Sequence, residues 1–209
     1  MDHLIAAAIH DAKNSLSALG VWLDKARGEH DSVALHQAAD LAARVNAQLV
    51  ELLALHRDGE GSLRMAVADH NLADFLADLQ TELPPGNEQR YKIAAADTLE
   101  KLGEWAFDAY LVKFVLLDAL RNALRHAHAK VTLSAAIEGG FLHIDIDDDG
   151  PGFPATVVQG EQGAMNAHSS GLGLVFARTI AERHRSPDGR HGHVQLSNPK
   201  GARFRLVLP

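Results

Sequence analysis

The stretch "IDIDDDGPGFP", residues 144–154, runs from alternating apolar and acidic residues into three consecutive aspartates and a glycine-rich turn. Alternation with a period of two is typical of a half-buried strand. Aspartate and glycine also form turns for local reasons, so a plain hairpin explains this stretch as well as a ligand-binding loop does. The choice between the two depends on the sequence on either side.

The sequence around this stretch mixes short strands with longer helices. Hydrophobic periodicity predicts helices over 71–83, 108–127 and 170–184, and strands over 130–137, 141–148, 193–198 and 202–209. "PPGN" at 84–87 stops the first of these helices. We therefore expect residues 61–209 to form an α+β domain, an α/β sandwich with helices on one face of a sheet.

The N-terminal part of the chain predicts a helical hairpin. Residues 4–57 have almost no Gly or Pro and break only at "RGEHDS", where Gly28 can end one helix and Asp31 or Ser32 can cap the next. The polar stretch "HRDGEGSLRM", residues 56–65, is the expected linker. Two helices cannot enclose a core, so we expect residues 1–60 to form a four-helix bundle in a homodimer. Apolar residues recur at spacings of three and four, at Ile5, Ile9, Ala12, Leu16, Leu19 and Leu23 and at Leu41, Val45, Leu49, Leu52 and Leu55.

Composition narrows the class of protein. The 209 residues are 46% hydrophobic, contain no cysteine and carry a formal charge of -7 without a basic stripe. Nucleic acid is therefore not expected as the main partner, because binding to the phosphate backbone needs clustered Lys and Arg. No apolar run approaches the ~20 residues that span a bilayer, so we expect a cytoplasmic chain without direct membrane insertion. The histidines of "RHAHA" and "HRSPDGRHGH" lack the companions of a zinc site and are expected at the surface.

Two further segments could bind a ligand. On the helix predicted over 108–127, Asp118, Asn122 and Arg125 share one face, where carboxylate and amide oxygens suit magnesium and a guanidinium suits phosphate. A solvated polar face explains the same pattern. Gly171 and Gly173 open the last predicted helix, where backbone N–H groups can approach phosphates, and residues 153–170 suit a mobile lid.

In order and spacing, these pieces resemble the nucleotide-binding domain of sensor histidine kinases, a branch of the Bergerat-fold ATPases that also includes gyrase. The resemblance covers about residues 70–209. Four boxes in order are a far more specific signal than any one of them. They are an asparagine box ending at Asn122, D-x-G-x-G at Asp148, Gly150 and Gly152, G-L-G-L at Gly171, Leu172 and Gly173, and G-x-x-F at Gly201 and Phe204.

The resemblance implies a site for ATP and Mg²⁺. Asp148 would accept a hydrogen bond from the adenine amino group, and the glycines of its box would let the backbone pass beneath the base. Asn122 would coordinate the magnesium that bridges the phosphates, with Arg125 near the phosphate chain. Asp118 stands where many histidine kinases have Asn, and an acid there can polarise the attacking group.

The other acidic residues of the opening stretch carry less information. Asp149 stands where many relatives have Asn, and Asp147 is expected to be the last residue of the strand. The repulsion among the three aspartates is moderate if two of them point to water, where screening weakens it. Ser169 stands where the glycine box often has another Gly.

The helical hairpin contains a second resemblance. "IHDAKNSL", residues 9–16, resembles the phospho-acceptor box H-[DE]-x-x-[NT] of histidine kinases, although Ser15 replaces a proline that often follows it. His10 would be the phosphorylated residue. Asp11 could take a hydrogen bond from one ring nitrogen and leave the other free to attack. Asn14 would place the water that dephosphorylates a partner aspartate.

Together these features predict a dimeric two-component histidine kinase core that phosphorylates itself from Mg-ATP and transfers the phosphoryl group to a response-regulator receiver domain. A phosphatase activity toward that partner is part of the same hypothesis. Two alternatives remain open, a histidine phosphotransferase or pseudokinase with a degenerate ATP domain, and a gyrase-like ATPase in which Asp118 activates water. The signal reaches the chain through an upstream sensor protein, or the chain is the catalytic end of a longer receptor.

Overall fold

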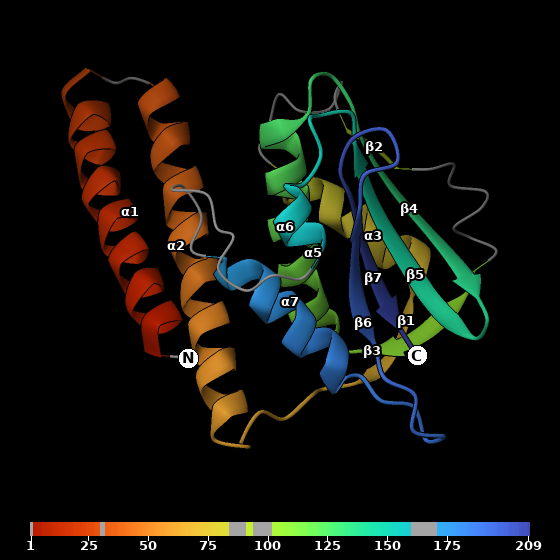
Figure 1. The fold of residues 1–209 in the computed structure, drawn as a ribbon. Helices are drawn as coiled ribbons and strands as arrows, with labels where there is room; N and C mark the ends of the chain where they lie inside the picture. Colours follow the sequence, from red (N-terminus) through yellow and green to blue (C-terminus); the bar gives the residue numbers. More distant parts are fainter. Residues whose placement is uncertain (1, 30–31, 84–90, 94–101, 160–170) are drawn as a thin grey trace. The chain divides into compact units, whose positions relative to one another are not determined.

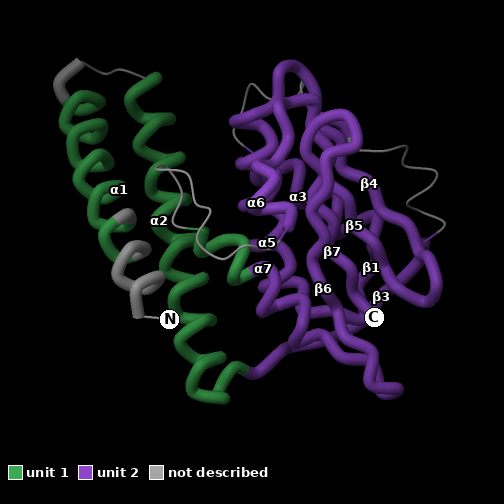
Figure 2. The backbone as a smooth tube through the Cα atoms, viewed as in Figure 1, with its two compact units in different colours: residues 1–63, 165–176 green, residues 64–164, 177–209 purple. Residues whose placement is uncertain are grey.

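The computed structural model describes residues 2–29, 32–83, 91–93, 102–159 and 171–209 (Figure 1). Two compact units are distinguished, residues 1–63 with 165–176, and residues 64–164 with 177–209 (Figure 2). Asp31, the "PPGN" stop and Ser169 lie outside the described residues, as does most of the predicted lid.

The hairpin prediction is confirmed by helices α1 (Asp2–Glu29) and α2 (Ser32–Gly59). Gly28 does not end the first helix, which continues to Glu29. Only part of each apolar stripe predicted for the hairpin is buried. Ala12, Val45 and Leu55 are buried, whereas large apolar residues elsewhere on the stripes are exposed. The most exposed on the α1 stripe follow at intervals of seven, with exposed fractions of 56% at Ile9, 53% at Leu16 and 42% at Leu23. No helix in the described part of the chain has the length and apolar character needed to cross a membrane.

The second unit is built on a mixed five-stranded sheet, which confirms the α+β class. The strands β2 (Tyr91–Ile93), β4 (Val131–Glu138), β5 (Phe141–Asp148), β6 (His193–Ser197) and β7 (Arg203–Leu208) lie in the order β2-β4-β5-β7-β6. Only β2 pairs in parallel, with β4, and the other pairs are antiparallel. The described part of this unit also contains helices α3 (Leu72–Thr81), α5 (Ala109–His126) and the short α6 (Ala155–Val158), whereas α7 (Leu172–Arg183) begins in the first unit and ends in the second.

The alternation in β5 separates an apolar face from an acidic one. Leu142, Ile144 and Ile146 are buried in the core, and α5 packs against β4 and β5. On the other face, Asp145 forms a two-point ion pair with Arg205 across the β5–β7 ladder, with both N–O distances 2.6 Å. These charges therefore stabilise the strand pair by cross-strand pairing, as expected for opposite charges in register.

A small second sheet was not expected from the sequence. β1 (Ala68–Asn71) pairs antiparallel with β3 (Glu104–Phe107), and neither strand shows a clear apolar alternation. Asn71 also begins α3, because its side-chain oxygen accepts a hydrogen bond from the Asp74 N–H. This cap matches the strong preference for Asn at helix N-termini.

A buried histidine joins the start of α5 to the end of α7. His184 is 2% exposed, which makes the prediction of a surface histidine wrong. Its Nδ1–H donates to the Ile180 carbonyl at 2.8 Å, and its Nε2 accepts from the Asp108 N–H at 3.0 Å. The Asp108 carboxylate in turn caps α5 at the Leu111 N–H and accepts from the Ala66 N–H, directly after the predicted linker. The ring is thus held as the neutral Nδ1–H form.

Stability is expected to fall in mild acid because of His184. Burial lowers the pKa of His184, while the unfolded chain binds a proton near the ordinary value of 6.5. The neutral His184 ring therefore makes its full contribution to the free energy of unfolding above pH 6.5. As the pH falls below that value, the free energy of unfolding decreases by up to about 1.4 kcal/mol per pH unit. Urea midpoints measured at about pH 7.5 and about pH 5.5 should show this fall. The variant His184→Leu should be less stable at the higher pH and show a smaller difference between the two; an unchanged difference would contradict the assignment.

Candidate functional site

Asp148 is the last residue of β5, so the prediction that the strand ends at Asp147 is wrong. Its N–H donates to the Ala202 carbonyl at 2.9 Å, and its Oδ1 accepts from the Gly150 N–H at 2.8 Å and the Ala202 N–H at 3.2 Å. Within the part of the chain that the structure describes, Oδ2 accepts no hydrogen bond. The half-buried carboxylate therefore offers one oriented acceptor to a ligand.

Two glycines allow the backbone to pack closely around Asp148. A Cβ at Gly150 would lie 2.5 Å from the His126 carbonyl oxygen, at the end of α5. A Cβ at Gly201 would collide with the carbonyl oxygen of Asp148. Both contacts are with backbone atoms, which cannot move aside as a flexible side chain can. The two boxes are therefore packed against each other and against α5.

Asn198 holds the rest of the D-x-G-x-G loop and was not identified from the sequence. Its side chain pairs with Phe153 at both ends, accepting from the Phe153 N–H and donating to the Phe153 carbonyl, each at 2.8 Å. Gly152 has φ +84, and a Cβ there would contact the Asn198 side chain. Glycine is thus required at Gly152 for its backbone conformation as well as for space.

The three consecutive aspartates have three different sets of partners. Asp147 pairs with Arg203 at two points, with N–O distances of 2.6 and 3.2 Å. Asp149 accepts from the N–H groups of Ala129 and Lys130, at 3.0–3.1 Å, and these backbone bonds lower its pKa. Separate partners for each carboxylate explain how the chain tolerates three like charges in sequence.

Helix α5 carries the asparagine box on its polar face. Its opposite face is buried through Val112, Leu116 and Leu120, and each such side chain contributes about 1.5–3 kcal/mol by burial. Asn122 is half-buried, whereas Asp118 and Arg125 are exposed. A single amide ligand from Asn122 is compatible with Mg²⁺, because this ion usually binds few protein groups and keeps water and substrate phosphates as its other ligands. The described residues contain no group of three or more His, Asp or Glu side chains that could hold a metal by themselves.

The glycine box lies at the start of α7, in the segment grouped with the helical hairpin. Gly171 precedes the helix with φ +66, a conformation that favours glycine. Leu172 is 1% exposed, and Gly173 belongs to the first turn. The backbone can thus present N–H groups at this helix end, but a role in phosphate binding stays a prediction.

His10 is exposed on α1, so its imidazole is not fixed in an apolar core. Asn14, one turn further, lies beside it, and its Nδ2–H donates to His10 Nδ1 at 3.2 Å. The structure therefore brings these two residues of the predicted phospho-acceptor box together. The side chain of Asp11 lies outside the described residues.

The comparison with protein families agrees with this geometry. Residues 107–209 match the family described as "Histidine kinase-, DNA gyrase B-, and HSP90-like ATPase". Residues 107–209 form a histidine kinase-type ATP-binding domain. The resemblance stated from the four boxes is thereby confirmed, and the D-x-G-x-G loop, the asparagine box and the last strand all lie inside this ATP-binding domain.

Two curated relatives that match nearly the whole chain are described as sensor proteins. The alginate biosynthesis sensor protein KinB of Pseudomonas aeruginosa is 25% identical over 220 residues, which cover 98% of this chain and 36% of KinB. The sensor protein KdpD of Escherichia coli is 28% identical over 225 residues, covering 99% of this chain and 24% of KdpD. The chain thus spans about a third or less of these relatives' lengths.

Solved structures show the same fold. The histidine kinase AdeS of Acinetobacter baumannii superposes with a TM-score of 0.65 at 17% identity, covering 95% of this chain and 96% of that one. The catalytic domain of the histidine kinase ThkA gives a TM-score of 0.56 at 17% identity, over 69% of this chain and 98% of the ThkA domain.

Gly201→Ala is expected to destabilise the ATP-binding domain by about 3 kcal/mol, or roughly 10 °C in Tm. The added methyl group would push the backbone of Asp148 away from the last strand. The matched control is Gly20→Ala in α1, where a Cβ meets nothing within 4 Å and alanine is the better helix former. Thermal unfolding of both variants checks the difference, and equal Tm values would show that the close approach is not needed.

Proposed function

We propose that this chain is the catalytic core of a dimeric two-component histidine kinase. Residues 1–60 would be its dimerisation and phosphotransfer hairpin and residues 61–209 its ATP-binding part. The γ P–O bond of ATP breaks, a P–N bond to His10 forms and ADP leaves; the phosphoryl group then passes to an aspartate of a response-regulator receiver domain. Family membership of residues 107–209 and the exposed His10–Asn14 pair support this proposal.

The observation that carries the proposal is the carboxylate of Asp148. Two backbone N–H groups hold its Oδ1, so that Oδ2 is left with a defined direction. An exocyclic amino group on a purine supplies the donor that this oxygen lacks. Gly150 and Gly152 let the loop pack closely against the His126 carbonyl and the Asn198 side chain, which fixes the backbone beside this carboxylate.

The phosphate end of ATP would be bound by α5 and by the glycine box. Asn122 would hold Mg²⁺ through its amide oxygen, and Mg²⁺, when bound, neutralises charge on the phosphates. Arg125 would pair with a phosphate oxygen, and Gly171, Leu172 and Gly173 would offer backbone N–H groups. Asp118, exposed on the same helix, would polarise the attacking ring.

His10 would act through its Nε2 atom, which needs a lone pair to attack phosphorus. The ring must then carry its proton on Nδ1, the atom that accepts from Asn14 in this structure. The Asn14 contact therefore opens before transfer, and Asp11 would accept the Nδ1–H instead. Asn14 would afterwards be available to place a water molecule for the phosphatase reaction.

A homodimer would cover the apolar residues that the hairpin leaves exposed. Ile9, Leu16 and Leu23 repeat every seven residues on α1, and α2 adds Leu35, Leu49 and Leu53, each at least 50% exposed. Such a repeat is typical of a helix seam that packs against other helices. A second copy of the hairpin would complete a four-helix bundle.

The test is to incubate the purified chain with γ-labelled ATP and magnesium, with and without candidate receiver domains. A labelled histidine that loses its label to a receiver supports the proposal. Absence of both labelling and Mg-ATP binding would instead indicate a histidine phosphotransferase or pseudokinase with a degenerate ATP domain, and phosphate release without a labelled protein would indicate a gyrase-like ATPase. An upstream sensor protein or a longer receptor with this part in the cytoplasm would supply the signal.

A further inference from the structure

Asp149 holds the short connection between α5 and β4. The Ala129 N–H donates to both carboxylate oxygens, at 3.0 and 3.1 Å, and the Lys130 N–H donates to Oδ1 at 3.1 Å. Its backbone adds two bonds, from His128 Nδ1 to the Asp149 carbonyl at 2.6 Å and from the Asp149 N–H to the Lys130 carbonyl at 3.3 Å. One residue therefore fixes residues 128–130 through its side chain and its backbone.

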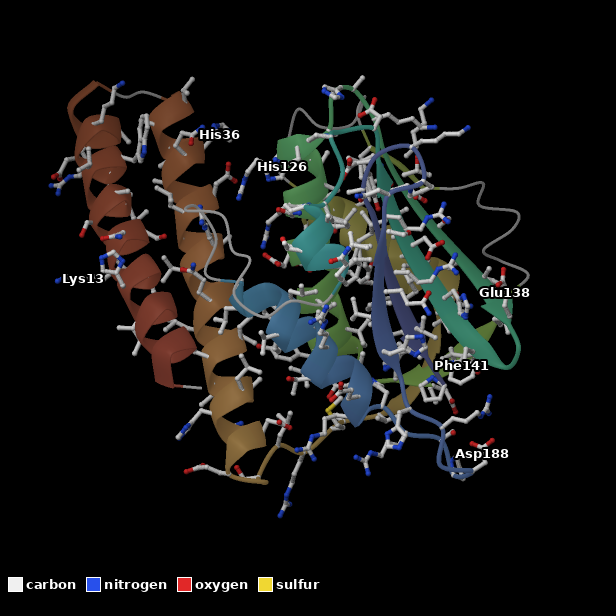
Figure 3. All side chains as sticks on the ribbon, viewed as in Figure 1. Lys13, His36, His126, Glu138, Phe141 and Asp188 are labelled. Atoms are coloured by element: carbon white, nitrogen blue, oxygen red, sulfur yellow. The ribbon has the colours of Figure 1, made fainter. Side chains whose placement is uncertain are left out.

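This connection follows helix α5, which carries the residues proposed for the phosphates, and it is bonded to the neighbour of Asp148, the residue proposed for the base. Helix α5 carries Asn122 and Arg125 and ends at His126, which Figure 3 labels. Asp148 directly precedes Asp149 in the chain. The residues proposed for the phosphates and the residue proposed for the base are thus joined through Asp149.

We propose that Asp149 is a positioning residue that fixes the adenine end of the site relative to its phosphate end. The inference rests on the proposed function. ATP must contact both ends of the site at once. If the connection at residues 128–130, here called the joint, is rigid, a nucleotide bound at one end is already positioned for the other, so the second contact forms as an intramolecular step. Asp148 takes its own position from Ala202 and Gly150, so recognition of the base alone does not need Asp149.

The chemistry of the joint predicts which substitution is tolerated. Backbone N–H groups, that of Ala129 foremost, lower the pKa of Asp149, so its carboxylate accepts in the ionised form at neutral pH. Asn keeps one oxygen, which can still accept from Ala129 and Lys130 at the position of Oδ1. Alanine keeps none. We therefore expect Asp149→Asn to preserve the joint and Asp149→Ala to release it.

The experiment measures binding of Mg-ATP and of adenosine to the full chain by calorimetry. Asp149→Ala should weaken Mg-ATP binding on the order of tenfold and adenosine binding by less than about twofold, because only the two-ended ligand needs the fixed joint. Asp149→Asn should bind both ligands as the unchanged chain does. The control Asp188→Asn removes the same charge in a turn that Figure 3 shows at the other end of this unit, and it should change neither affinity.

Three results would overturn the inference: unchanged Mg-ATP affinity in Asp149→Ala, equal weakening of both ligands, or failure of Asp149→Asn to restore binding. If Asp149→Ala does not fold, Asp149→Ser replaces it, because its shorter side chain does not reach two amides. Failure of the unchanged chain to bind Mg-ATP would refute the proposed function, and this inference with it, which is distinct from failure of a variant alone.

Discussion

Asp148→Asn is expected to abolish detectable ATP binding while the ATP-binding domain stays folded. The Asn oxygen can replace Oδ1 as acceptor of the Gly150 and Ala202 N–H groups, so the loop keeps its anchors. The amide nitrogen then stands in the place of Oδ2 and presents a donor to the amino group of adenine. Two facing donors leave both groups unpaired, and a loss of affinity of at least about 100-fold follows. Calorimetry with Mg-ATP measures the loss.

Thermal unfolding distinguishes this effect from misfolding. Asp148→Asn should keep a Tm close to that of the unchanged chain, whereas Asp148→Ala removes the acceptor of two N–H groups and should lower it. If Asp148→Asn bound Mg-ATP with the original affinity, the carboxylate would not recognise the base and the nucleotide would have to sit elsewhere.

His10→Gln is expected to eliminate autophosphorylation and leave ATP binding unchanged. Glutamine keeps the size and polarity of an exposed helical side chain but offers no imidazole nitrogen to attack phosphorus. The expected loss is complete, because no remaining group supplies the bond-forming lone pair. Labelling with γ-³²P-ATP and calorimetry on the same preparation measure the two activities separately.

The control for His10→Gln is His36→Gln, which replaces an exposed histidine of α2 (Figure 3). It should keep full labelling, since His36 lies outside the phospho-acceptor box. Retained label in His10→Gln would refute the assignment of the phosphorylated residue. Loss of label in both variants would point to damage to the hairpin rather than to the chemistry.

Elements with a strong local pattern were predicted closely from the sequence. The spacing of three and four along α1, α2 and α5 and the alternation in β4, β5 and β7 each repeat over two or more turns or residue pairs, so chance matches are rare. Strands β1, β2 and β3 were missed because each has only three or four residues. Their pairing with a distant strand, and not a hydrophobic period, holds them in place.

The candidate site likewise contains residues that the sequence identified and one that it did not. Asp148, Gly150 and Gly201 could be selected from the sequence, because the boxes keep a fixed order. The contribution of Asn198 could not be found, since an isolated Asn before Pro reads as an ordinary turn residue. Its partner, Phe153, lies 45 residues earlier in the chain.

The sequence by itself determined that the chain has a helical hairpin and an ATP-binding domain, because hydrophobic periodicity is a property of neighbouring residues and the order of the boxes can be followed along the chain. Only the tertiary structure decided what each of the three aspartates does. The partners of Asp147, Asp148 and Asp149 are Arg203, Ala202 and the 129–130 backbone, which lie 19 to 56 residues away. Three consecutive aspartates look alike in the sequence, which does not indicate the partner of each carboxylate. Only folding brings each partner within hydrogen-bond distance.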